Sequence, residues 1–264
     1  MNKPCITNIL SVKEECPSVK TITFPFSGTM IPGQFFMIWI PGVDEIPMSV
    51  SMIHKNEKAI TFRDVGEATH ALYEMKPGDK IGIRGPYGNG FTLPKGHLLV
   101  VGGGTGIAML APAIETALQQ HRKVTVVLGV KTHKELFFQD RFESLGASVI
   151  VSTDDGTCGR KGTAATCVQT ILNDTQFSAV LTCGPELMMK ALFQLCEHLP
   201  FQASLERYMK CGIGLCGQCC VDTGLRVCTE GPVFSGAQLK TIPDFGVFTR
   251  DASGCKKKIS GTEL

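Results

Sequence analysis

The sequence has no large excess of charge of either sign and no long apolar run. Its 26 Lys and Arg residues are nearly balanced by 24 Asp and Glu residues, which leaves a formal net charge of +2. That balance gives no reason to expect nucleic acid or an anionic membrane as a partner. No apolar run reaches the ~18–20 residues needed to cross a bilayer. The first residues also lack an apolar signal core, so we expect a cytoplasmic protein.

A recognisable catalytic pair of nucleophile and base is also lacking. The six histidines stand in predicted strands, helices or loops with no motif around them. A histidine in such a setting is more often a surface or core residue than a catalyst. We therefore expect no catalytic acid–base residue, and a chemistry supplied by bound cofactors.

Cysteine, in contrast, is abundant. The chain has twelve, and five of them crowd into one short segment. In a cytosolic protein such a group indicates metal or redox chemistry rather than disulfides. Four follow the spacing C-x4-C-x2-C-x8-C, namely Cys211, Cys216, Cys219 and Cys228. The C-x4-C-x2-C core is that of plant-type [2Fe–2S] ligation.

Two alternatives compete with an iron–sulfur cluster in this segment. Structural zinc sites usually present two C-x2-C pairs, whereas the fourth ligand here would be the lone Cys228. Disulfides are disfavoured by the expected compartment. The fifth cysteine, Cys220, fits no ligand position, and we expect it to pack beside the cluster.

Three regions differ in their apolar pattern. Residues 1–95 contain short Val-, Ile- and Phe-rich strands separated by Pro and Gly, with one helix at residues 67–75, which favours an antiparallel β-barrel. Residues 96–200 alternate strands with helices, including a continuous helix at residues 134–145, which predicts a doubly wound parallel sheet. Residues 201–264 carry the cysteine segment and are expected to form a small third domain.

Two strand-to-helix turns of the α/β region contain glycine. The first includes Gly103, Gly104, Thr105 and Gly106, and the second Cys183, Gly184 and Pro185. Exposed N–H groups and the helix dipole at such turns favour a phosphate. The standard G-x-G-x-x-G fingerprint is absent, and tight turns also use glycine for structural reasons. Both turns are expected at the carboxyl ends of strands, facing one crevice, so together they predict a nucleotide site.

Several motifs, in order along most of the chain, resemble the ferredoxin–NADP reductase superfamily, and within it the electron-transfer subunits of the heteromeric dihydroorotate dehydrogenases. The segments similar to the family's flavin motifs are Pro47-Met48-Ser49-Val50-Ser51, Gly66-Glu67-Ala68-Thr69 and residues 85–91. Those similar to its nicotinamide loops are residues 102–107 and 182–185, and those similar to its cluster domain are residues 204–206, 211–219 and 227–234. The cluster segment is the specific one, because the nicotinamide loops are shared across the superfamily.

This resemblance implies three cofactors. FAD would be bound by the barrel, through Pro47, Met48, Ser49, Val50, Ser51, Arg63, Val65, Gly66, Ala68 and Thr69. NAD would occupy the two glycine turns, and a [2Fe–2S] cluster the four cysteines. A flavin can accept two electrons together and pass them on singly, which makes it the natural converter between a hydride and the cluster.

The resemblance also implies a partner. Electrons would come from dihydroorotate on a catalytic subunit that carries FMN, cross the cluster and FAD, and reduce NAD⁺ in pyrimidine biosynthesis, within a heterotetramer. One alternative is a subunit that links NAD(P)H to ferredoxin or a hydrogenase. Another, from a different class, is a zinc-stabilised nucleotide-sensing module without redox chemistry.

Two positions leave questions open. The family's arginine before Pro47 is Ile46 here, so a cation for the flavin pyrophosphate is missing, and Arg63 and Arg84 are the candidates to replace it. Acidic residues at 154–155 favour the free 2′-hydroxyl of NAD, whereas basic residues at 160–161 favour the 2′-phosphate of NADP. The family resemblance favours NAD.

Overall fold

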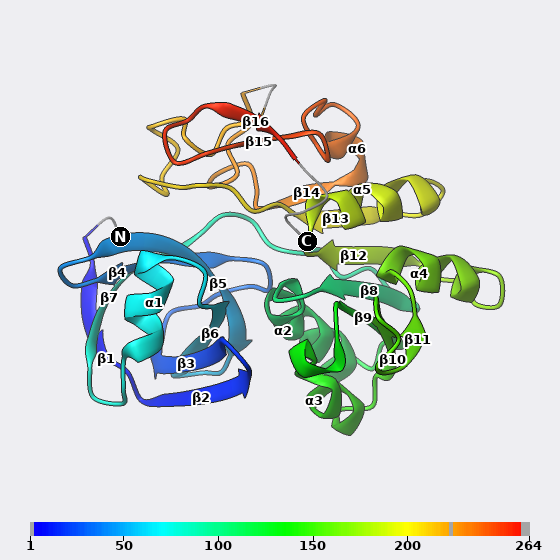
Figure 1. Ribbon diagram of the computed structural model, residues 1–264, viewed down its shortest axis with the longest axis horizontal. Helices are drawn as coiled ribbons and strands as arrows, with labels where there is room; N and C mark the ends of the chain where they lie inside the picture. Colours follow the sequence, from blue (N-terminus) through cyan, green and yellow to red (C-terminus); the bar gives the residue numbers. More distant parts are fainter. Residues whose placement is uncertain (1–2, 222–223, 260–264) are drawn as a thin grey trace.

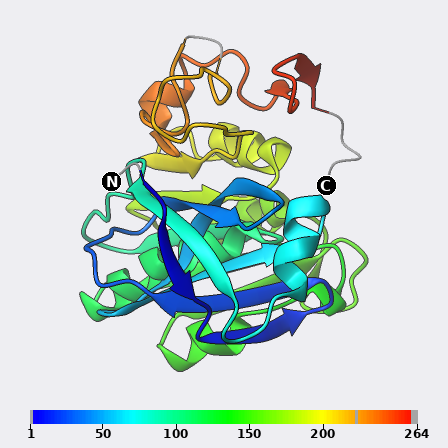
Figure 2. The same ribbon diagram turned by 90° about the vertical axis from the view of Figure 1, so that its left-hand side faces the viewer.

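The computed structural model describes residues 3–221 and 224–259. It contains two seven-stranded sheets and a third part, residues 205–259, that is mostly loops. Figures 1 and 2 show this third part lying across the top of both sheets. None of the helices in the described residues is long and apolar enough to span a membrane.

The first sheet is antiparallel throughout, with the strand order β1-β7-β4-β5-β6-β3-β2. Its strands are β1 (Cys5–Asn8), β2 (Ser11–Cys16), β3 (Val19–Pro25), β4 (Phe35–Ile40), β5 (Asp44–Ile53), β6 (Glu57–Arg63) and β7 (Lys80–Tyr87). The helix α1 (Glu67–Glu74) packs on β4 and β5. The predicted antiparallel barrel sheet is therefore confirmed.

Strand β4 is apolar on both faces because each face is covered. Alternate side chains of a strand point to opposite faces. Phe36 and Ile38 join the core of the barrel, whereas Phe35 and Met37 join the apolar cluster that includes the cysteine segment. The next residue in that second row, Trp39, is 37% exposed. The cysteine segment thus packs directly on the barrel and covers Phe35 and Met37 of β4, but leaves Trp39 partly exposed.

The second sheet has the order β11-β10-β9-β8-β12-β13-β14 and is parallel except for β14. Its strands are β8 (Leu98–Gly103), β9 (Val124–Val130), β10 (Ser148–Thr153), β11 (Arg160–Lys161), β12 (Ala179–Cys183), β13 (Phe201–Ser204) and β14 (Val233–Ser235). Its helices are α2 (Gly106–Gln119), η1 (His133–Glu135), α3 (Gln139–Ser144), α4 (Ala164–Leu172) and α5 (Glu186–Leu195).

Helices cover both faces of this sheet. Along β8, Leu98 and Val100 pack toward α2 and α3, whereas Leu99 and Val101 pack toward α4 and α5. The chain adds strands on one side of β8 and then returns to add β12 on the other side. The predicted doubly wound sheet is therefore confirmed, and its direction reverses between β8 and β12, where ligands of such sheets bind.

The prediction of one continuous helix at residues 134–145 is wrong. The chain forms the short η1, breaks, and starts α3 after Phe138, which adopts a left-handed conformation with φ 67°. Phe137, Phe138 and Phe142 are all buried. Turning two adjacent aromatic rings into the core requires the break, because neighbouring positions of one helix point in different directions.

The α/β sheet also continues beyond residue 200, where the alternation of strands and helices was expected to stop. Strand β13 pairs in parallel with β12, and β14 pairs antiparallel with β13. The remaining elements are α6 (Gly236–Leu239) and a hairpin of β15 (Phe248–Arg250) and β16 (Lys256–Lys258). The cysteine segment therefore leaves the α/β sheet after β13, and the chain returns to the sheet as its edge strand β14.

Candidate functional site

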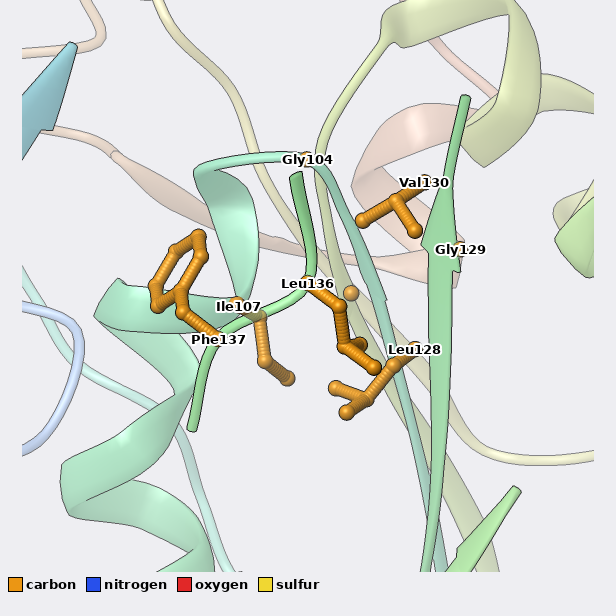
Figure 3. Close-up of a pocket in the computed structure, with 8 residues that line it drawn as sticks. Gly104, Ile107, Leu128, Gly129, Val130, Leu136 and Phe137 are labelled. Carbon is orange, nitrogen blue, oxygen red and sulfur yellow. The ribbon is translucent and has the colours of Figure 1, made fainter. Parts of the chain in front are cut away.

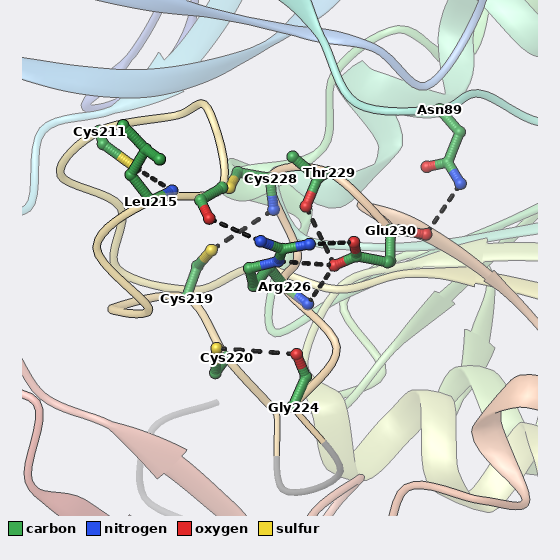
Figure 4. Close-up of polar contacts among 11 residues, drawn as sticks. Asn89, Cys211, Leu215, Cys219, Cys220, Gly224, Arg226, Cys228, Thr229 and Glu230 are labelled. Carbon is green, nitrogen blue, oxygen red and sulfur yellow. Dashed lines mark hydrogen bonds and ion pairs between the residues drawn. The ribbon is translucent and has the colours of Figure 1, made fainter.

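The four cysteines of the predicted ligand set are arranged as two pairs, Cys211 with Cys216 and Cys219 with Cys228. Figure 4 shows Cys211, Cys219 and Cys228 in one loop region. The Sγ of Cys211 accepts hydrogen bonds from the N–H of Leu215 at 3.4 Å and from that of Cys216 at 3.5 Å. The Sγ of Cys219 accepts one from the N–H of Cys228 at 3.5 Å. A backbone N–H, that of Gly214, also faces the thiol of Cys228, so N–H groups already face the sulfur atoms of three of the four cysteines.

The thiols of this loop have perturbed pKa values. Burial opposes ionisation of Cys211, but N–H groups of the loop outweigh it and lower the pKa of its thiol to about 6. A hydrogen bond from the Cys228 thiol lowers the pKa of Cys219, and the same bond raises the pKa of Cys228. Thiolates are the form in which cysteine binds metals, so Cys211 and Cys219 are prepared for that role.

The chemistry of this donor set fits a two-iron cluster better than a disulfide. All twelve cysteines belong to the described residues, and none forms a disulfide. Within residues 3–221 and 224–259, no three or more His, Cys, Asp or Glu side chains converge on one point as a site for a single ion. Two neighbouring thiol pairs instead supply four sulfur donors. Cys220 stands apart, because its Sγ points to the carbonyl oxygen of Gly224 at 3.9 Å.

The cysteine loop is fastened to the barrel. A guanidinium N–H of Arg84 on β7 donates to the carbonyl oxygen of Cys211 at 3.1 Å. Gly212 packs so closely that a Cβ at this position would lie 2.8 Å from Cγ of Met37. Met37 in turn pairs with Pro47, the first residue of the predicted flavin segment, across strands β4 and β5. The loop thus contacts β4 directly beside the strand that carries that segment.

The two predicted glycine turns meet at the β8–β12 switch point. A Cβ at Gly106 would lie 2.5 Å from the carbonyl oxygen of Cys183, and one at Gly184 would lie 2.8 Å from Cα of Gly103. Only glycine permits so close an approach of two backbones. At Gly104, φ is +51° and a Cβ would meet no atom within 4 Å, so this position faces open space.

A shallow apolar depression lies beside the first turn, on the β9 side. Figure 3 shows Ile107, Leu128 and Leu136 gathered below Gly104. These side chains fill the space and offer no polar group to a ligand. The depression is therefore a packing feature. The better candidate for a nucleotide is the crevice expected outside the carboxyl ends of β8 and β12, where the two glycine turns meet.

Cys183 at this crevice is paired with a carboxyl group. Its buried Sγ donates to Oε1 of Glu206, in the segment after β13, at 3.9 Å. Burial raises the pKa of the Cys183 thiol well above its usual value. Glu206 keeps an exposed face, but the surrounding protein desolvates its carboxyl and raises its pKa. A neutral thiol and a carboxyl therefore stand where the nicotinamide segment was predicted.

The predicted flavin residues occupy β5 and the start of α1. Pro47, Met48 and Ser49 are half-buried, whereas Val50 and Ser51 are buried. The hydroxyl of Ser51 accepts a hydrogen bond from the Thr61 hydroxyl at 2.8 Å, so it faces a neighbouring strand. Pro47, Met48 and Ser49 are therefore the members of this segment that remain accessible.

At the start of α1, the Thr69 hydroxyl organises the turn. It accepts hydrogen bonds from the N–H groups of Val65 and Gly66, both at 2.9 Å. Val65 is 76% exposed. The N–H groups of Glu67 and Ala68 follow in the first turn of the helix, where backbone donors have no partner within the helix.

Neither candidate for the missing arginine is free of other contacts. Arg84 binds Glu45 and the Cys211 carbonyl, and Arg63 forms an ion pair with Glu135 at 3.5 Å. Both members of the Arg63 pair are 27% exposed, so the contact is loose enough to exchange for another anion. Ile46 itself packs against the apolar core of the barrel. Arg84 is thereby unsuited to the role, and Arg63 stays a candidate.

Comparison with family models identifies two parts of the chain. Residues 206–240 match the iron-sulfur cluster binding domain of dihydroorotate dehydrogenase B, and residues 100–194 match an oxidoreductase NAD-binding domain. The first match covers the cysteine loop and the second covers both glycine turns. Both descriptions are those of redox domains, so they argue against the alternative of a zinc-stabilised module without redox chemistry.

Among solved structures, the chain is similar to one from a study entitled "Insights into flavin-based electron bifurcation via the NADH-dependent reduced ferredoxin-NADP oxidoreductase structure". The TM-score is 0.81 at 29% identity, over 88% of this chain and 89% of that one. Phthalate dioxygenase reductase shares the fold at a TM-score of 0.64 and 15% identity, over 77% of this chain and 69% of that one.

Two relatives match over nearly their full length. Each is named "Probable dihydroorotate dehydrogenase B (NAD(+)), electron transfer subunit". The one from Methanocaldococcus jannaschii is 45% identical over 97% of this chain and 99% of its own. The one from Methanothermobacter thermautotrophicus is 44% identical over 96% and 97%. The chain therefore belongs to the family of dihydroorotate dehydrogenase B electron transfer subunits.

Proposed function

We propose that this chain receives electrons that a catalytic partner takes from dihydroorotate, and delivers them to NAD⁺. One observation carries the proposal. Gly212, next to the candidate ligand Cys211, packs on Met37, whose strand partner Pro47 begins the flavin segment. A cluster and a flavin bound at these positions would both lie beside β4, close to one another as electron transfer between them requires.

The cluster would be held by Cys211, Cys216, Cys219 and Cys228. The pairing of the thiols supports two ligands for each iron. The N–H groups that face Cys211 and Cys219 would stabilise the negative charge on the sulfur atoms, and hydrogen bonds of this kind help to set the reduction potential of a cluster.

FAD would lie against β5 and the start of α1. The residues proposed to contact or shape its site are Pro47, Met48, Ser49, Val50, Ser51, Arg63, Val65, Gly66, Ala68 and Thr69. When bound, it supplies the conversion between the hydride of a nicotinamide and the single electrons of a cluster. The N–H groups at the start of α1 would bind a phosphate, because a helix N-terminus attracts anions.

NAD would occupy the crevice between the two glycine turns. The residues proposed to contact or shape its site are Gly103, Gly104, Thr105, Gly106, Cys183, Gly184 and Pro185. Their backbones approach one another so closely that they fix the crevice at the end of β8 and β12. The first turn of α2 would then present its N–H groups to the pyrophosphate.

The partner would be a dihydroorotate dehydrogenase catalytic subunit with FMN. The relatives are named as electron transfer subunits of a dehydrogenase, which supports a substrate site on another chain. The similarity to the structure from the ferredoxin–NADP oxidoreductase study favours a second candidate, in which the chain links NAD(P)H to ferredoxin.

Reconstitution tests this function. The isolated chain should contain about two irons and one FAD, reduce an artificial dye with NADH, and leave dihydroorotate unchanged. Mixed with the dihydroorotate-oxidising flavoprotein of the same organism, it should reduce NAD⁺. Serine at any of the four ligand cysteines should remove or destabilise the cluster, and Cys220→Ser is the matched control that should keep it. Stoichiometric zinc, or dihydroorotate turnover by the isolated chain, would refute the proposal.

A further inference from the structure

Arg226 lies between the last two candidate ligands in sequence, and its guanidinium reaches back to the first part of the cysteine loop (Figure 4). Nη1 donates to the carbonyl oxygen of Gly214 at 2.6 Å. Gly214 adopts φ +79°, and a Cβ there would lie 2.8 Å from Cγ2 of Thr229 and 3.2 Å from Nη1 of Arg226. Both the backbone conformation and the approach of Arg226 therefore require glycine at this position.

The guanidinium is itself held in place by Glu230. Nη2 of Arg226 donates to Oε1 of Glu230 at 2.6 Å, and Nε donates to Oε2 at 3.1 Å. The same carboxylate accepts from the N–H of Arg226 at 2.7 Å and from the Thr229 hydroxyl at 3.0 Å. Asn89, after β7, donates to the carbonyl oxygen of Glu230 at 2.8 Å. Contacts on both sides thus fix the direction in which the guanidinium points.

The carbonyl that Arg226 binds belongs to the same peptide unit as the N–H of Leu215. In a trans peptide the C=O and the N–H point in opposite directions. Since Arg226 holds the Gly214 carbonyl on one side, the Leu215 N–H must point to the other, where it donates to Sγ of Cys211 at 3.4 Å. The orientation of one peptide plane therefore links a surface arginine to a ligand sulfur.

We propose that Arg226 is a positioning residue that sets the reduction potential of the cluster by holding the Gly214–Leu215 peptide with its N–H toward Cys211. The inference rests on the proposed function, because it takes Cys211 as a cluster ligand. An N–H directed at a ligand sulfur stabilises the more negative, reduced state. Without Arg226 this peptide is free to rotate, and reduction becomes less favourable.

The chain provides a closely matched control. Arg250 on β15 also donates from its guanidinium to a carbonyl of the same loop, that of Cys220, at 3.3 Å. The N–H of that peptide unit belongs to Val221, and it donates to the Leu225 carbonyl at 2.8 Å, not to a cysteine. Arg250→Met therefore removes a positive charge and a loop contact, as Arg226→Met does, without altering an N–H that faces sulfur.

Redox titration of the purified, cluster-loaded chain, followed by electron paramagnetic resonance, tests the inference. Arg226→Met should lower the equilibrium constant for one-electron reduction of the cluster about tenfold, or ~59 mV, and Arg250→Met less than twofold. In protein labelled with 15N-leucine, pulsed resonance should detect a leucine nitrogen coupled to the reduced cluster in wild type and lose it in Arg226→Met.

If Arg226→Met fails to retain iron, Glu230→Gln replaces it in the test, since it loosens the guanidinium and should give a smaller shift in the same direction. Equal potentials in wild type and the Arg226 or Glu230 variant, or equal shifts in Arg226→Met and Arg250→Met, would overturn the inference. If Cys211→Ser keeps a cluster with wild-type properties, the proposed ligand set is wrong instead. Failure of the inference about Arg226 and failure of the proposed function are therefore distinguishable.

Discussion

Arg84 on β7 and Glu45 on β5 form an ion pair across the intervening strand β4, with Nε of Arg84 donating to Oε1 of Glu45 at 2.7 Å. The side chains are 9% and 21% exposed. Hydrogen bonding to Glu45 raises the pKa of Arg84 further, so the guanidinium is charged at any physiological pH. Its remaining N–H groups reach the Tyr87 hydroxyl at 3.2 Å and the Cys211 carbonyl. The pair thereby anchors the cysteine loop to the barrel.

Removing one member of this pair should be costly. Arg84→Met leaves the Glu45 carboxylate largely buried without a cation, and we expect it to lower the free energy of unfolding by about 3 kcal/mol. In the double variant Arg84→Met/Glu45→Leu much of that loss should be recovered, because no charge is left unpaired. Urea unfolding of the two variants measures the difference. The looser pair offers the control, since Arg63→Met should cost less than about 1 kcal/mol.

The role of Arg84 could not be read from the sequence. As an arginine on a strand beside the flavin segment it is an equally good candidate for a pyrophosphate contact, and only the register of β5, β4 and β7 brings it to Glu45. The strands of the α/β sheet were easier to predict. Apart from Thr125, the run Val124–Val130 is apolar because both faces of β9 are covered, and that pattern is local.

Other features could be predicted only in part from the sequence. The pair Arg226 and Glu230 has the i,i+4 spacing and lies beside a ligand cysteine, so the sequence contained a signal for it. Which peptide it orients depends on the folding of residues 211–216, which no local pattern fixes. Likewise, the break before Phe138 reflects a demand of the core, and the helical periodicity of residues 134–145 gave no sign of it.

The nucleotide crevice makes a prediction about two nearby glycines. Gly104→Val strains the left-handed backbone of the turn at φ +51°, but its side chain enters open space. We therefore expect a change confined to the turn, with the FAD content kept while reduction of the flavin by NADH slows at least tenfold. Gly106→Ala instead forces a Cβ against the Cys183 carbonyl, and it should disturb the sheet itself. The rate of flavin reduction by NADH, measured by stopped flow, and the flavin content distinguish the two variants. An unchanged rate of flavin reduction in Gly104→Val would mean that NAD does not bind in this crevice.

His97, before β8, predicts a pH dependence. Burial, and then the charge of Lys123, lower the pKa of His97 below its ordinary value of about 6.5. The unfolded chain therefore takes up a proton at a higher pH than the folded chain does. The stabilisation is complete above about pH 6.5 and is lost as the pH falls toward the folded-state pKa. His97→Gln should flatten the fall in Tm between pH 7.5 and 5.5, and an unchanged slope would assign the dependence to other groups.

The cysteine loop also predicts where the catalytic partner docks. The sequence predicts that the surface from Tyr208 to Cys220 meets the partner, with Met209, Ile213 and Leu215 as apolar contacts. In the structure Leu215 is 80% exposed and Tyr208 58%, whereas Met209 packs partly against the apolar core and Ile213 is half-buried. Leu215 is the strongest candidate contact, because its own N–H faces the sulfur of Cys211.

Leu215→Glu should therefore weaken the complex with the proposed dihydroorotate-oxidising partner. Burying a leucine side chain contributes about 1.5–3 kcal/mol, so placing a charge there should raise Kd at least tenfold. Iron and FAD content should stay the same, because the side chain points to solvent. Leu145, which follows α3 in the α/β domain and is 48% exposed, provides a matched control, and Leu145→Glu should leave Kd unchanged. Calorimetric titration of each variant with the partner measures both values. An unaltered Kd in Leu215→Glu would mean that the partner binds away from the cysteine loop, and electrons would then have to enter this chain by another route.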